Sequence, residues 1–386
     1  MMKTQRLSLD IISSLPQNII ETILTLMPIR DALRTSILSK KWRYSWMTMP
    51  KLVFDNNLVR AISGTGILLK YKLVNAIFHV LLLHSGPAIL KFELSVNKLG
   101  METEFDQIIL FLSRRINVKC LIIENNSDPC YKLPTSFFLI KGLESLELFC
   151  CDFEPPLTFN GFNKLRDVYF EDVRVTAEVL QNFLSSCPLL EEVFLIADEK
   201  EYVDEKFINF ETFFQSAPLI HTLYISKYYM KYMAAGGMPD KLPTSLHLKD
   251  VGLGVCLRER DVISSALCII RSSPNLEQLS FQMYDNEKLP IKESSIKFVD
   301  LQYDLSLTLD HLTHFGIISF SNNVFEMECV KLIMAKSPVL TLARIQLEDK
   351  VSVDEELKIL RDMIYRPFSR ASPSAKLLIE RPKTSS

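Results

Sequence analysis

A short apolar template recurs along most of the chain and constrains its fold more than any other feature. The template reads apolar-x-x-apolar-x-apolar. Its copies begin at Ile89, Val118, Leu143, Leu165, Leu190, Ile220, Pro243, Leu276, Leu312 and Leu342. The copy at Pro243 is degenerate, because proline occupies its first position. The second positions of successive copies lie 22 to 36 residues apart, with a mean of 28. Such a regular spacing predicts stacked units of similar structure.

A period of about 20–29 residues with this template is the signature of leucine-rich repeats. The second and third apolar positions alternate along a strand and therefore point into the same core. We expect ten parallel strands and predict buried side chains at Leu146, Val193, Leu223 and Leu279. Helix-like segments before several copies end in proline, at Ser186-Cys187-Pro188, Ser216-Ala217-Pro218, Ser273-Pro274 and Ser337-Pro338. An α/β domain with accidental leucine spacing is the alternative, and the four proline junctions argue against it.

The first fifty residues follow a helical period instead. Apolar side chains form one stripe at Ile19, Ile20, Ile23, Leu24 and Met27, between Pro16 and Pro28. A second stretch spaces Leu38, Trp42 and Trp46 four apart, which predicts one helix face. These short helices cannot hide so many apolar side chains from one another, so some should meet a partner or the rest of the chain. A generic apolar hairpin is the competing interpretation.

Residues 15–43 resemble an F-box without gaps. The matching residues are Leu15-Pro16, Ile19-Ile20, Ile23-Leu24, Met27-Pro28-Ile29, Asp31, Ser36, Leu38-Ser39-Lys40 and Trp42-Arg43. Trp46, Pro50 and Leu52-Val53-Phe54-Asp55 are similar to the plant type, while Asn18, Met27 and Leu38 depart conservatively from the usual pattern. Residues 310–380, with Arg370-Ala371-Ser372-Pro373-Ser374-Ala375, resemble the FBD domain that closes plant F-box proteins.

The resemblance implies an α/β fold. It consists of a three-helix F-box at 9–55, a curved leucine-rich-repeat solenoid at 56–310 with parallel strands on its concave face, and an FBD-like unit at 311–380. It also implies the substrate-recognition subunit of a Skp–cullin–F-box (SCF) ubiquitin ligase, which binds a Skp-type adaptor and, through it, cullin and RING subunits. The adaptor-binding residues carried over are Leu15, Pro16, Ile19, Ile20, Ile23, Leu24, Met27, Pro28, Ile29, Leu38 and Trp42. An interaction scaffold that acts outside a ligase is the alternative.

Composition and motifs favour a binding protein over an enzyme. The net charge is −2 with 44 basic and 46 acidic side chains, so a nucleic-acid partner is not expected. His311 and His314 lack further metal ligands, and no G-x-S-x-G motif occurs, so we expect no catalytic residue, metal or cofactor. Eight scattered cysteines and the absence of an apolar leader indicate the cytoplasm or nucleus. The apolar run from Ile77 to Leu83 is too short to span a membrane.

Two neighbouring stretches are candidates for binding the target protein. Residues 191–211 hold eight acidic and two basic side chains, and residues 224–233 interleave tyrosines with lysines. Tyrosine is enriched at binding hot spots, and acidic side chains steer a basic partner. We therefore predict target contacts at Tyr228, Tyr229, Tyr232, Glu199, Glu201, Asp204 and Glu205. A solvated loop beside an ordinary repeat explains the same pattern.

Overall fold

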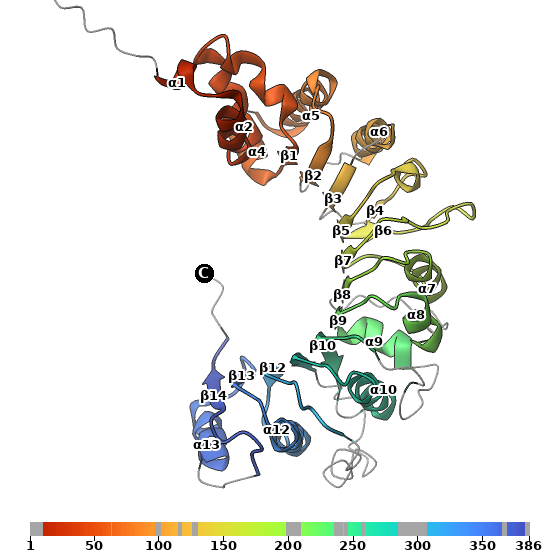
Figure 1. Cartoon of the computed structure of the whole chain (residues 1–386), viewed down its shortest axis with the longest axis vertical. Coiled ribbons are helices and arrows are strands. Elements are labelled where there is room, and N and C mark those ends of the chain that lie inside the picture. Colours follow the sequence, from red (N-terminus) through yellow and green to blue (C-terminus); the bar gives the residue numbers. More distant parts are fainter. Residues whose placement is uncertain are drawn as a thin grey trace, which may run out of the picture. The chain divides into compact units, whose positions relative to one another are not determined.

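The chain forms two compact units, Met1–Leu165 and Arg166–Ser386, in the computed structural model. The structure describes residues 11–62, 64–96, 102–114, 118–125, 130–197, 210–234, 242, 246–256, 259–284, 307–364 and 369–382. Each unit alternates parallel strands with helices, and the helices lie on one side of the strands (Figure 1). N-terminal helices followed by a long parallel sheet are the architecture that the sequence predicts for leucine-rich repeats.

The first unit begins with short helices and continues into strands. The helical elements are α1 (Ile11–Ser14), α2 (Gln17–Thr25), α3 (Ile29–Arg34), the 3-10 segments η1 (Thr35–Ile37) and η2 (Trp42–Thr48), α4 (Asn56–Ala61), α5 (Gly66–Leu83), α6 (Glu102–Ser113) and η3 (Phe137–Leu139). The strands are β1 (Lys51–Phe54), β2 (Ile89–Ser95), β3 (Val118–Glu124), β4 (Tyr131–Lys132), β5 (Ser145–Phe149) and β6 (Cys151–Asp152). The main sheet runs β1-β2-β3-β5, and β4 pairs with β6.

The second unit contains eight strands in sequence order among its described residues. These are β7 (Asp167–Glu171), β8 (Glu192–Ile196), β9 (Thr222–Ile225), β10 (Asp250–Val255), β11 (Gln278–Met283), β12 (His314–Phe320), β13 (Leu342–Leu347) and β14 (Lys376–Glu380). Its helices are α7 (Ala177–Ser185), α8 (Phe210–Ser216), α9 (Lys227–Ala234), α10 (Arg260–Arg271), α12 (Val324–Lys336) and α13 (Val353–Ile364). The predicted proline junctions are confirmed, since α7, α8, α10 and α12 each end two or three residues before the proline.

The second and third template positions form the core. Leu146, Val193, Leu223 and Leu279 lie on β5, β8, β9 and β11 and are at most 2% exposed, which confirms the prediction. The alternation arises because successive side chains of a strand point to opposite faces of the sheet. The backbone repeats as well: the amide of His221 donates to the Glu191 carbonyl at 2.9 Å, and that of Lys249 donates to the His221 carbonyl at 2.8 Å.

Two strands of the main sheet were not expected, nor was the small β4-β6 sheet, and two copies of the template are shifted. β1 pairs with β2 although its residues fall within the predicted F-box range, and β14 extends the sheet beyond β13. The predicted copy at Pro243 is wrong. Val251 on β10 lies opposite Leu223 and Leu279, so the true copy begins at Leu248. The copy at Leu342 is wrong by two residues, because Ala343 lies opposite Phe315.

Helix α5 is the single described helix that is long and apolar enough to cross a membrane. The apolar run from Ile77 to Leu83 is too short to span a membrane, but it is only the end of a helix that begins at Gly66, so its length does not decide the question. Its buried side chains are Leu73, Ile77, Val80 and Leu81, and the other three each lie three or four residues from Ile77. A single buried stripe is typical of a helix that covers a sheet with one side.

Gly254 allows β10 to pass the start of α9. A Cβ at this position would overlap the backbone nitrogen of Lys227 and lie 2.7 Å from its Cα. These are backbone atoms, which cannot rotate away. We expect Gly254→Ala to destabilise the second unit by about 1–3 kcal/mol, measured as a lower thermal midpoint by circular dichroism. Gly316→Ala is the matched control, since its Cβ would meet no atom closer than 3.6 Å. Equal midpoints for the two variants would contradict the close approach.

Glu326 closes the N-terminus of α12 from a buried position. Asn323 caps the helix, and the Glu326 carboxylate accepts hydrogen bonds from the amides of Ser321 at 2.9 Å and Asn323 at 3.3 Å. Glu326 is 4% exposed, and this burial raises its pKa from 4.5 to about 7 despite those bonds. A carboxyl group whose pKa is higher in the folded chain makes folding take up a proton.

The stability contributed by Glu326 should therefore fall as pH rises. It is fully present below pH 4.5, the unfolded value, and is lost by the time pH has passed the folded value near 7. At about 1.4 kcal/mol per pKa unit, the loss reaches up to about 3 kcal/mol. We expect Glu326→Gln, whose amide oxygen can still accept the cap bonds, to remove this slope. Urea unfolding of both proteins between pH 4 and 8 measures it, and parallel curves would contradict the assignment.

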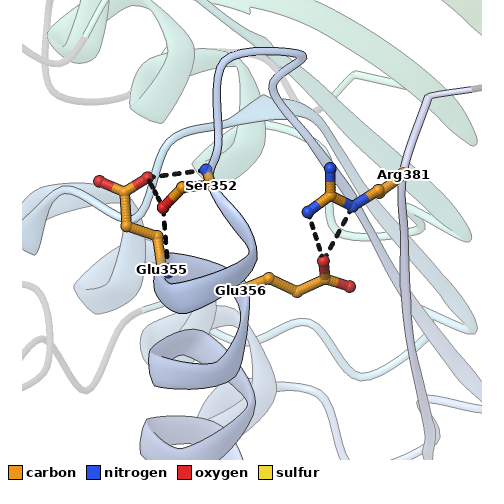
Figure 2. A network of polar contacts seen from close by, with 4 residues as sticks. All are labelled: Ser352, Glu355, Glu356 and Arg381. Carbon is orange, nitrogen blue, oxygen red and sulfur yellow. Dashed lines mark hydrogen bonds and ion pairs between the residues drawn. The ribbon is translucent and has the colours of Figure 1, made fainter.

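A second capping box fixes α13 near the C-terminus of the second unit. The Ser352 hydroxyl accepts from the Glu355 amide at 3.3 Å, while the Glu355 carboxylate accepts from the Ser352 amide at 2.8 Å (Figure 2). The hydrogen bonds that the Ser352 amide and hydroxyl donate to the Glu355 carboxylate lower the pKa of Glu355. Arg381, just after β14, donates twice to Glu356 at 2.7 and 2.8 Å. The ion pair joins the strand's end to the helix.

Candidate functional site

The N-terminal helices pack around a small core of their own. Pro16 precedes α2, and Ile20 and Leu24 on this helix are completely buried. The same helix leaves Ile19 41% exposed. The period of the stripe thus produces a helix with one buried apolar side and a second apolar side that meets solvent.

Trp42 ties the 3-10 segment η2 to the start of the chain. Its indole nitrogen donates to the Ile12 carbonyl at 3.0 Å, and the Lys41 ammonium donates to the Leu15 carbonyl. Trp42 and Trp46 are buried, whereas Leu38 is 48% exposed. The prediction that these three share one helix face is wrong, because a turn at 38–41 separates η1 from η2. The indoles fill the core while Leu38 points to solvent.

The second unit presents an aromatic row on the side of the sheet opposite its core. Tyr169, Phe194 and Tyr224 occupy equivalent positions on β7, β8 and β9. The Phe194 and Tyr224 rings stack at 5.0 Å with planes 17° apart, and the Tyr169 and Phe194 rings lie 5.7 Å apart. All three side chains are half-buried. Large half-exposed rings in register are a typical element of a binding surface.

Carboxylates border this row on both sides. Asp167, Glu192 and Asp250 lie two residues before it on β7, β8 and β10, and Glu171 lies two residues after it on β7. The Tyr224 hydroxyl donates to Asp250 at 2.9 Å, and the Tyr169 hydroxyl donates to Glu171 at 2.7 Å. Burial raises the pKa of Asp167 and of Asp250, and the Glu192 carboxylate raises both further.

Known families match both the N-terminal helices and the repeats. A model of the F-box domain matches residues 12–54, and a model of the leucine-rich repeats of the FBD-associated F-box protein At5g56370 matches residues 110–205. The Arabidopsis thaliana F-box/FBD/LRR-repeat protein At1g13570 is 33% identical, across 96% of this chain and 98% of its own length. This chain belongs to the F-box/FBD/LRR-repeat protein family. The Arabidopsis thaliana F-box/FBD/LRR-repeat protein At3g26920 is 24% identical, across 87% of this chain and 74% of its own length.

Members of this family are typically non-catalytic adaptors, and the F-box implies binding to a Skp-type adaptor. The structure divides the residues predicted for that contact. Four are buried and build the F-box core instead of an exposed surface: Ile20, Leu24, Ile29 and Trp42. Four are exposed, namely Pro16, Ile19, Pro28 and Leu38, and three are half-buried, namely Leu15, Ile23 and Met27.

Sequence reasoning missed three exposed apolar side chains of the F-box that follow helix α2. Leu26 is 82% exposed, Ile37 is 88% exposed and Tyr44 is 61% exposed. Leu26 directly follows α2, Ile37 is the last residue of η1, and Tyr44 lies in η2 between the buried Trp42 and Trp46. Large apolar groups exposed beside a filled core mark an interaction surface. Ile37, beside Leu38 in the F-box motif, was the one most accessible to prediction.

The predicted target contacts fare differently. Tyr229 is completely buried, and its hydroxyl donates to the Val173 carbonyl at 3.1 Å. It is part of the core, so the prediction that it contacts the target protein is wrong. Tyr228 is half-buried and packs edge-on against Tyr229. Tyr232 lies on α9, but its side chain is outside the described residues. The four acidic residues of this prediction also lie outside the described residues: Glu199, Glu201, Asp204 and Glu205.

Proposed function

We propose that this protein is the substrate-recognition subunit of an SCF ubiquitin ligase. The observation that supports the proposal is the exposed apolar surface of the F-box, which carries Ile19, Leu26, Ile37 and Leu38 outside a core that is already filled. Burying one such side chain is worth about 1.5–3 kcal/mol. Four of them together supply about 6–12 kcal/mol, which can offset most of an association cost of roughly 4–15 kcal/mol when an adaptor covers them.

The mechanism is positional. The F-box attaches the chain to the adaptor, the repeats hold a target protein, and cullin and RING subunits bring the ubiquitin-charged enzyme to that target. The contribution to catalysis is proximity, since fixing two reactants together replaces a bimolecular encounter. A ligase subunit of this kind would work in the cytoplasm or the nucleus.

Affinity purification of the tagged full-length chain from cells tests the proposal. Mass spectrometry should detect adaptor, cullin and RING peptides together. Adaptor peptides without cullin would instead indicate an interaction scaffold that acts outside a ligase. Absence of the adaptor in a direct co-expression experiment, with a chain folded by circular dichroism, would overturn the F-box function.

A further inference from the structure

The outward side of β7–β10 differs in charge from the rest of the second unit's sheet. We call it the acidic aromatic face, and its residues are Asp167, Tyr169, Glu171, Glu192, Phe194, Ile196, Thr222, Tyr224, Asp250 and Gly252. These positions include four carboxylates and no lysine or arginine. Further along the same sheet, by contrast, Arg344 on β13 pairs with Glu380 on β14 at 3.6 Å. The positions of β11 and β12 on this side hold no carboxylate, so the concentration of acidic residues is local to β7–β10.

The rings of the acidic aromatic face are held in place. Tyr224 lies over β10, because a Cβ on Gly252 would come 2.5 Å from its Cε1 atom. The hydroxyls of Tyr224 and Tyr169 are bound by carboxylates at 2.9 and 2.7 Å. The Phe194 and Tyr224 rings stack with their planes 17° apart, and the Tyr169 ring is tilted by 33° against Phe194. The row therefore offers apolar contact that is already ordered, so a partner bears little ordering cost.

The carboxylates of this face are arranged at a cost to folding. Asp167 and Glu192 are opposite each other on adjacent strands, and like charges in that relation destabilise a sheet. The basic groups near Asp167 are Arg166, which pairs with Glu191, and His221 at the start of β9. Burial raises the pKa of Asp167 most, the Glu192 and Glu191 carboxylates raise it further, and Arg166 and His221 lower it. Repulsion retained in a stable sheet is typical of a surface kept for binding.

We propose that the acidic aromatic face binds a basic segment of the target protein, one that carries arginine or lysine side chains. The proposal deepens the proposed function and rests on it for the existence of a target. Arginine and lysine lay their alkyl stems on apolar surface and keep their charge at its border. The ring row supplies that surface, and the carboxylates lie two residues away along the strands, about 6.6 Å. A phosphate-bearing ligand would be repelled by all four carboxylates.

Synthetic peptides of twelve residues test this on the full-length chain. One alternates arginine with alanine, and a second replaces each arginine with neutral citrulline. We expect the arginine peptide to bind by calorimetry, with an affinity that falls as salt rises, and the citrulline peptide to bind at least tenfold more weakly. Equal binding of the two peptides would overturn the proposal.

Variants locate the binding site. Asp167→Asn with Glu192→Gln should weaken the arginine peptide about tenfold or more and reduce the salt dependence. The control, Glu277→Gln with Glu348→Gln, changes the net charge equally but lies outside the acidic aromatic face, and should bind within twofold of the parent protein. The first pair removes a repulsion, so its thermal midpoint should be equal or higher while binding falls. If both pairs bind alike, the site is wrong.

Phe194→Thr provides a second measurement, because threonine suits a strand but removes the central ring. Binding should again fall about tenfold in a chain that keeps its circular dichroism spectrum. Unchanged affinity would mean that charge alone attracts the peptide and would overturn the role of the aromatic row. Adaptor co-purification is recorded for every variant. Its loss in the unchanged protein counts against the ligase function, whereas failure of peptide binding with the adaptor retained counts only against this inference.

Discussion

Leu223→Ala is expected to lower the free energy of unfolding of the second unit by about 2–5 kcal/mol. Leu223 is completely buried on β9, between Val193 on β8 and Val251 on β10. Removing its isobutyl group deletes apolar contacts on both neighbouring strands and leaves a cavity that a continuous sheet cannot close by moving one strand. Urea titration followed by circular dichroism measures the loss.

Leu219→Ala is the matched control for this prediction. Leu219 precedes β9 by three residues and is 47% exposed, so its truncation should change stability by only about 0.5 kcal/mol or less. The same residue type is therefore deleted twice, four positions apart, inside and outside the repeat template. Similar losses for both variants would show that the template does not identify the core.

The repeat could be predicted from sequence because the same apolar position recurs in successive strands, and three such recurrences are enough to define the repeat length. The prediction of the repeats is wrong where contacts with another repeat determine which residue type a strand position can hold. β10 contains Gly252 and Gly254, which weaken the strand signal, yet each is required by Tyr224 or by the start of α9. Strand β14 was not predicted, because the polar residue Ser374 occupies the first template position before Leu377. Local propensity carries no information about what approaches a glycine from another repeat.

The candidate sites were harder to predict than the fold. Periodicity located the F-box helices, but it could not distinguish buried Trp42 from exposed Ile37, because the hydrogen bond from Trp42 to Ile12 joins residues thirty positions apart. The acidic aromatic face was missed for a similar reason. Its rings are separated by 25 and 30 residues in sequence, and comparing the outward positions of successive copies would have revealed Tyr169, Phe194 and Tyr224 in register.

Replacing Ile37 and Leu38 together with aspartate is expected to abolish co-purification with a Skp-type adaptor. These side chains are 88% and 48% exposed, so the F-box should keep its fold. If an adaptor buries both, their loss removes about 3–6 kcal/mol of binding free energy, and two uncompensated carboxylates in the interface add to the penalty. The affinity should fall by more than about a hundredfold, as measured by surface plasmon resonance with purified adaptor.

The control variant replaces an exposed isoleucine and an exposed leucine elsewhere in the same unit. Ile67 is 87% exposed at the start of α5, and Leu157 is fully exposed in a loop. Replacing both with aspartate changes hydrophobicity and charge by the same amount without altering the F-box, so adaptor affinity should remain within twofold of the parent protein. An adaptor that binds the Ile37 and Leu38 variant as tightly as this control would place the contact on another part of the F-box. Because the two variants are matched in composition, any difference between them must come from where the side chains lie.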